Sequence, residues 1–120
     1  DTFTRNLESM VAVARAHGAE VAFVTQAVWS ADPSTDDFWS GRNRLRALGM
    51  LEERLRAVAN QLEVPLIDAA PELLEAERAS AGAGEAAGVF ADDVHLTDRG
   101  AALLAALVAA ELEEQGLLGD

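Results

Sequence analysis

The sequence predicts an α/β fold in which helices cover both faces of a parallel sheet. Two short, mostly apolar segments, 20–25 and 65–68, alternate with longer segments whose apolar residues recur at helical spacing. The resulting order is helix, strand, helix, strand, helix, helix, which is typical of parallel strands joined by helical crossovers. The chain has 120 residues, half of them hydrophobic, which is the size of one ordinary domain.

The first expected helix covers residues 3–17, because apolar side chains recur there every three or four positions and Gly18 is placed to end it. The residues available to cap its start are Asp1, Thr2 and Thr4. The segment 20–25 follows and is nearly continuously apolar rather than alternating. This pattern predicts a central strand that is covered on both faces.

A long loop, residues 26–41, is expected after this strand, and it carries the aromatic residues Trp29, Phe38 and Trp39. Open α/β sheets bind their ligands beyond the carboxyl ends of the strands, so the loop is a candidate substrate wall. We therefore predict Trp29 and Trp39 as substrate-binding residues. The alternative is that the rings only cover the end of the sheet and the next helix.

The longest helix is expected over residues 43–62, with apolar residues on one face and most charged residues on the other. Pro65 ends this pattern and opens a second short strand, 65–68, at a position where a missing backbone donor is tolerated. A short helix is expected to begin near Pro71, because proline suits the first helical turn.

A Gly- and Ala-rich stretch, 80–88, is expected to be a surface loop, and the last helix should begin at about Thr97 and end before Gly116.

Two strands are too few for a parallel sheet that buries both faces. We therefore expect further strands, either preceding Asp1 or belonging to a second chain.

The composition excludes several classes of function. The formal net charge is −12, and all nine basic residues are arginines, so a nucleic acid partner is not expected. There is no cysteine, which excludes disulfides and thiolate metal sites. No apolar run reaches the roughly 20 residues that span a bilayer. The chain begins at Asp1 rather than Met, so we expect that a segment has been removed, and no compartment is assigned.

The segment Asp92-Asp93-Val94-His95-Leu96-Thr97 carries the most plausible chemistry. An Asp three residues before a His, in a turn ahead of a helix, can hold one imidazole nitrogen and leave the other as a base. Asp93 is the rival for the role of the acid. The alternative without any chemistry is that the aspartates are solvated loop or capping carboxylates and that His95 merely precedes a helix. A third interpretation is a metal site made of Asp92, Asp93, His95 and Asp98.

Four segments in this order resemble the C-terminal half of an SGNH (GDSL-type) hydrolase. They are FTRNLESM (3–10), GAEVAFVT (18–25), VPLID (64–68) and FADDVHLTDRG (90–100). The resemblance covers nearly the whole chain, and its most specific part is Asp-x-x-His-Leu-Thr-x-x-Gly. It implies a flavodoxin-like, three-layer α/β/α fold with a parallel sheet. Residues 1–120 would form the C-terminal part of that domain, with about two strands and four helices.

The resemblance also implies a reaction, the hydrolysis of esters or thioesters of lipids, acylated sugars or small molecules. In that family the nucleophilic Ser lies in a Gly-Asp-Ser block near the start of the domain, and a Gly and an Asn from two later blocks help to build the oxyanion hole. None of these blocks is present in this chain, and Asn6 does not match the Asn of the family. The last block carries over, with Asp92 as the orienting acid and His95 as the base.

The expected function is therefore the C-terminal part of a serine ester hydrolase without a cofactor. Its substrate would be a small-molecule ester or acylated compound, and the Ser would lie upstream or on another chain. The 120-residue chain alone is expected to be inactive. The alternative is a non-catalytic SGNH-like module for binding or assembly. A phosphate-binding flavodoxin-like domain is a weaker option, because no Gly-rich loop follows either strand.

Overall fold

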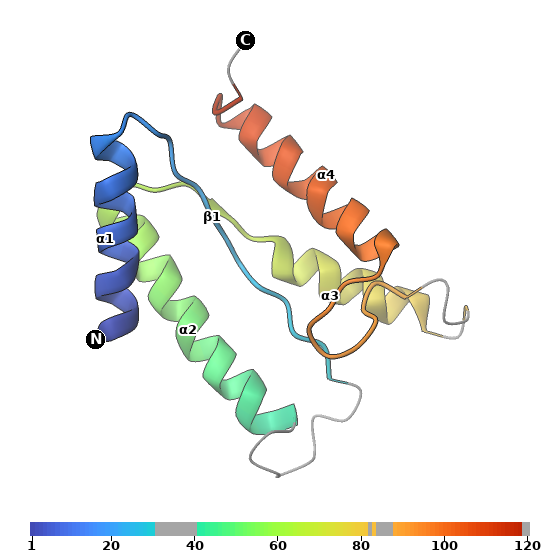
Figure 1. Ribbon diagram of the computed structural model, residues 1–120. Coiled ribbons are helices and arrows are strands. Elements are labelled where there is room, and N and C mark those ends of the chain that lie inside the picture. The colour runs from blue at the N-terminus through green and yellow to red at the C-terminus, as the bar shows by residue number, and fades with distance from the viewer. Residues whose placement is uncertain (31–40, 82, 84–87, 119–120) are drawn as a thin grey trace.

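The computed structural model describes residues 1–30, 41–81, 83 and 88–118 (Figure 1). The elements are α1 (Thr2–Ala16), β1 (Phe23–Val24), α2 (Gly41–Leu62), β2 (Leu66–Ile67), α3 (Ala69–Ser80) and α4 (Asp98–Glu114). This order confirms the predicted alternation of helices and strands. The described part of the chain is mostly helical, with one small parallel sheet, which is compatible with the α/β class.

The two strands are shorter than predicted. They pair in parallel, with Phe23 opposite Leu66 and Val24 opposite Ile67. Among the described residues, β2 is the only strand that pairs with β1, so the other edge of β1 has no partner strand. The expectation of a strand covered on both faces is wrong in this structure, because Phe23 and Thr25 are buried while Val24 between them is 39% exposed.

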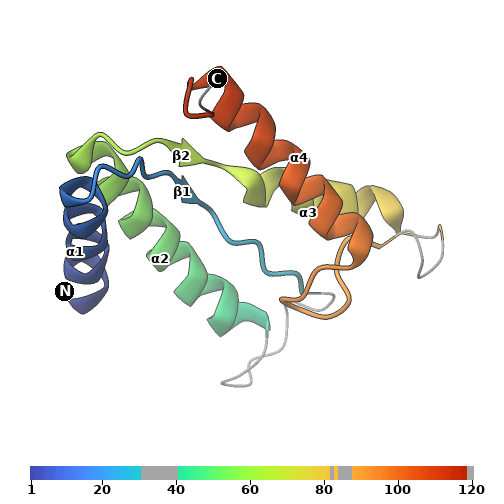
Figure 2. The ribbon, with the colours of Figure 1, turned by 45° about the horizontal axis from the view of Figure 1, so that its top comes forward.

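The helices pack in two pairs around the strands, α1 with α2 and α3 with α4. Figure 2 shows α1 and α2 on one side of the strands and α4 on the other. Each pair has its own hydrophobic cluster. The buried residues of the first are Val11, Phe23, Val58, Ala59 and Val64. Those of the second are Ala27, Ile67, Ala69, Ala70, Leu73, Val89 and Phe90.

The starts of the helices follow capping chemistry. The Asp1 carboxylate accepts a hydrogen bond from the Thr4 amide at 2.9 Å, and the Thr97 hydroxyl accepts one from the Gly100 amide at 3.1 Å. Both caps confirm predictions. Helix α3 begins at Ala69 rather than near Pro71. Pro71 lies within its first turn, where a proline is tolerated because the amides of that turn have no helical acceptor.

Three helices end in the same backbone motif, in which the chain turns through a residue with positive φ. Gly18 (φ 73°) and Gly116 (φ 66°) occupy this position after α1 and α4, as predicted for helix ends. After α2 the position is held by Glu63, with φ 52°. The hydrogen bonds from the Glu63 amide to the Asn60 carbonyl and from the Val64 amide to the Ala59 carbonyl complete the motif.

We expect Glu63→Gly to stabilise the protein by about 0.5–1 kcal/mol, because the left-handed conformation penalises a β-carbon by more than the added chain entropy of glycine costs. Urea denaturation followed by circular dichroism measures this difference. The reverse change at the equivalent position of α1, Gly18→Glu, should destabilise by a similar amount. An unchanged or lower stability of Glu63→Gly would contradict the strain assigned to Glu63.

Candidate active site

The predicted acid–base segment lies in a closed loop that joins α3 to α4. The two legs of the loop meet in an antiparallel bridge between Phe90 and Leu96. The amide of Ala91 donates to the His95 carbonyl at 2.8 Å, and the amide of Thr97 donates to the Val89 carbonyl at 2.9 Å. These bonds fix the backbone around residues 91–95. We call residues 89–97 the dyad loop.

Asp92 is bonded to His95 in two ways. One carboxylate oxygen, Oδ1, accepts hydrogen bonds from the amides of Val94 (2.9 Å) and His95 (2.8 Å). The other, Oδ2, lies 2.7 Å from Nδ1 of the His95 imidazole. The predicted contact between Asp92 and Nδ1 is therefore present. A carboxylate at Nδ1 favours the tautomer in which Nε2 is unprotonated and able to act as a base.

The pKa of Asp92 is lowered from its ordinary value of 3.8 to about 2. The backbone hydrogen bond from His95 is the largest cause, followed by the one from Val94 and then by the imidazole contact. All three favour the ionised form. Because the folded-state pKa is depressed, the stabilisation from ionised Asp92 is present above pH 3.8 and is lost as the pH falls through about 2.

NMR titration of the Asp92 carboxyl should therefore give a midpoint near pH 2, well below that of an exposed aspartate. The Asp92→Ala variant, which has no side-chain oxygen to accept these bonds, should lose the amide protection that they give to Val94 and His95. A midpoint close to 3.8 would contradict the hydrogen-bonded geometry of the dyad loop.

Both side chains of the pair are open to the surroundings. The His95 side chain is 77% exposed and that of Asp92 is 56% exposed. Within the part of the chain that the structure describes, His95 Nε2 has no hydrogen-bond partner. The imidazole is thus fixed at one nitrogen and accessible at the other, as a general base must be.

The dyad loop lies on the carboxyl side of the strands. The Trp29 amide, in the segment that continues from β1, donates to the Asp93 carbonyl at 2.8 Å. Figures 1 and 2 show the loop before α4 beside the end of this segment. Open α/β sheets bind ligands at this edge. The position of the pair is therefore suited to a substrate site.

The other predicted site residues are placed as follows. Trp29 is half-buried and packs against the cluster that contains Ala27 and Ile67. Its role in substrate binding stays a prediction, and Trp39 lies outside the described residues, as does Phe38. The carboxylate bonded to His95 Nδ1 is that of Asp92 rather than its rival Asp93. In the described parts of the chain, no group of three or more acidic or histidine residues is arranged to hold a metal ion.

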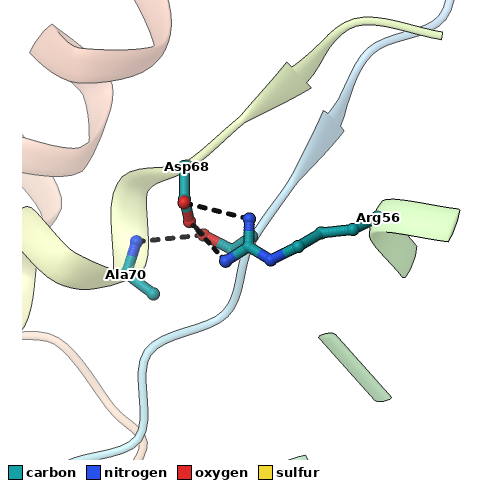
Figure 3. Close-up of polar contacts among 4 residues, drawn as sticks. Arg56, Asp68 and Ala70 are labelled. Atoms are coloured by element: carbon teal, nitrogen blue, oxygen red, sulfur yellow. Dashed lines mark hydrogen bonds and ion pairs between the residues drawn. The ribbon is translucent and has the colours of Figure 1, made fainter. Parts of the chain in front are cut away.

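A second polar cluster, which sequence reasoning missed, joins the ends of both strands (Figure 3). The Thr25 hydroxyl donates to Asp68 Oδ1 at 2.9 Å and accepts from the Ala70 amide at 3.0 Å. Arg56 of α2 holds Asp68 with two bonds of 2.9 and 3.1 Å. The Arg56 guanidinium is the main reason why the pKa of Asp68 is lowered. Thr25 and Asp68 each follow an apolar strand segment, which was the available signal, but nothing in the sequence pointed to Arg56.

A pocket of about 540 Å³ adjoins this cluster between α2 and α3. Arg56, Glu52 and Arg78 contribute charged groups to walls that also contain Leu48 and Leu74. Burial raises the pKa of Glu52. Neither Asp92 nor His95 lines this pocket, so it is separate from the pair.

Comparisons with known proteins add no identity. No family model matches the chain, and no curated protein or solved structure is significantly similar to it. None of the described helices combines the length and the apolar character needed to cross a bilayer.

Proposed function

We propose that Asp92 and His95 are the acid–base half of a serine ester hydrolase of the SGNH type. The observation that carries the proposal is the 2.7 Å contact between Asp92 and Nδ1 of an imidazole whose other nitrogen is accessible. The motif Asp-x-x-His-Leu-Thr-x-x-Gly supports the family, and the position of the dyad loop at the carboxyl edge of the strands supports the role. The flavodoxin-like, three-layer fold is part of the same proposal.

In this mechanism His95 Nε2 takes the proton of a serine hydroxyl while the serine oxygen forms a bond to the carbonyl carbon of the ester. The tetrahedral intermediate breaks its bond to the alcohol oxygen, and His95 returns the proton to that leaving group. Water then attacks the acyl-enzyme, with His95 again taking the proton and giving it back to the serine. Asp92 stays ionised throughout and stabilises the imidazolium, which agrees with its depressed pKa.

The serine of the reaction is proposed to lie outside these 120 residues. None of the described serines, Ser9, Ser30 and Ser80, is hydrogen-bonded to His95. Ser9 donates to the Arg5 carbonyl in α1, and Ser80 donates to the Glu77 carbonyl in α3. Ser34 and Ser40 lie outside the described residues.

The open side of β1 supports this part of the proposal. A groove of about 320 Å³ runs along it, lined by apolar residues of α1, β1 and α2, among them Phe3, Leu7, Val24, Leu51 and Leu55. The radius of gyration is 16.1 Å, whereas a compact domain of this length has about 14 Å. We infer that a further segment covers the groove, pairs with β1 and brings the serine block of the resemblance. The complete protein is this chain together with that segment or partner chain.

A fluorophosphonate probe, which labels activated serines covalently, tests the proposal. The complete protein should be labelled at one serine outside the 120 residues, and His95→Ala should abolish the labelling. The purified 120-residue chain should show neither labelling nor turnover of short p-nitrophenyl esters. Absence of labelling in the complete protein would favour the binding or assembly module instead, and His95-dependent turnover by the chain alone would contradict the external serine.

A further inference from the structure

Glu77, in the last turn of α3, holds the base of the dyad loop. Its Oε2 atom accepts hydrogen bonds from the amides of Val89 at 2.5 Å and Phe90 at 3.0 Å, residues twelve and thirteen positions further along the chain. Bonds from amides to an ionised carboxylate are among the stronger hydrogen bonds in proteins. The same oxygen therefore fixes two consecutive residues of the loop's first leg.

The location of Glu77 within α3 indicates a tertiary role. A negative charge in the last turn of a helix is unfavourable for the helix dipole, so the carboxylate does not serve the helix itself. Val89 is fully buried, and a buried amide without an acceptor is costly. Glu77 is half-buried and supplies that acceptor.

The residues that Glu77 holds are those that align the leg carrying His95. The carbonyl of Val89 accepts from the Thr97 amide at 2.9 Å, and Phe90 forms the bridge to Leu96. His95 and Thr97 flank Leu96, so the backbone of His95 is set by the two residues that Glu77 fixes. The amide of His95 is in turn one of the donors to Asp92.

We propose that Glu77 is a positioning residue for the Asp92–His95 pair, acting through the Val89–Phe90 leg of the dyad loop. Its importance for turnover rests on the proposed function, whereas its effect on the geometry of the pair does not. The carboxylate contacts neither Asp92 nor His95 and acts only through the backbone of the dyad loop. Its loss should therefore change the alignment of the pair and leave the rest of the fold in place.

NMR titration of Asp92 in the complete protein tests this proposal without any need for turnover. In Glu77→Ala the Asp92 midpoint should rise from about 2 toward 3.8, and the amides of Val89 and Phe90 should exchange faster with solvent. Glu77→Gln keeps an acceptor oxygen and should restore both values. Glu75→Ala, on the same helix, removes a carboxylate that pairs with Arg78 on the surface, and it should change neither.

Glu77→Asp provides a second variant in case the alanine variant does not fold, because the shorter side chain cannot reach both amides. An Asp92 midpoint that stays near 2 in either variant would overturn the proposal, as would a failure of Glu77→Gln to restore it. In the hydrolysing protein, Glu77→Ala should lower kcat by up to roughly 100-fold with little change in KM. If the complete protein has no esterase activity but Glu77→Ala still raises the Asp92 midpoint, the hydrolase function is wrong and the positioning role of Glu77 stands.

Discussion

Replacing His95 with alanine in the complete protein should lower kcat for a short p-nitrophenyl ester by roughly 10⁴- to 10⁶-fold. Without the imidazole, the serine hydroxyl keeps its proton and remains a weak nucleophile at neutral pH. Asp92→Asn should also be severely impaired, by roughly 10⁴-fold, because an amide at Nδ1 favours the wrong tautomer of the imidazole. Steady-state kinetics at saturating substrate measures both effects.

The chain offers a matched control for this experiment. His17, the only other histidine, is the residue at the C-terminal end of α1 and belongs to no part of the proposed site. His17→Ala should leave kcat and KM unchanged. If His95→Ala retained wild-type turnover, the catalytic assignment of the pair would be wrong, whatever the complete protein hydrolyses.

The second large effect is expected at Gly100, where α4 meets the dyad loop. A β-carbon at this position would lie 2.1 Å from the Val89 carbonyl oxygen, a backbone atom that cannot move aside alone. Relieving this overlap requires a shift of α4 or of the loop, and overpacking of this kind costs about 1–3 kcal/mol. We therefore expect Gly100→Ala to lower the free energy of unfolding by that amount. The shift should also displace the leg that carries His95 and reduce turnover.

Gly49→Ala is the matched control for Gly100→Ala. Gly49 lies inside α2, and a β-carbon there would meet no atom within 4 Å. Alanine should therefore stabilise the helix by about 0.5–1 kcal/mol, the ordinary gain over glycine in a helix. Urea denaturation of both variants gives the comparison. Equal stabilisation of the two would show that the close approach of Gly100 to Val89 does not exist in solution.

The local signals of the sequence were sufficient for the order of the elements and for most helix ends. Asp1 and Thr97 cap helices because their side chains reach amides three residues away, which is a property of the nearby sequence. Gly18 and Gly116 end helices because glycine adopts positive φ freely. The Asp92–His95 contact was predictable because it is also local, its two residues being three positions apart.

The features that were missed depend on contacts between distant parts of the chain. The role of Glu77 requires α3 to pack beside residues 89–90, and Arg56 reaches Asp68 across the end of the sheet. Neither contact leaves a periodic or motif signal. The lengths of the strands were overestimated because a strand extends only as far as a neighbouring strand pairs with it. The residues of one strand do not show how long its neighbour is. The end of α2 at Leu62 was predicted, but the turn through Glu63 was not, because glutamate seldom adopts a positive φ.

An experimental structure of the complete protein tests the central claim most directly, through the distance from His95 Nε2 to the nearest serine hydroxyl. We predict a serine Oγ atom within about 2.6–3.2 Å of Nε2, with Asp92 still bonded to Nδ1. A serine beyond the reach of the imidazole, or an Nε2 atom covered by an apolar neighbour, would contradict the account.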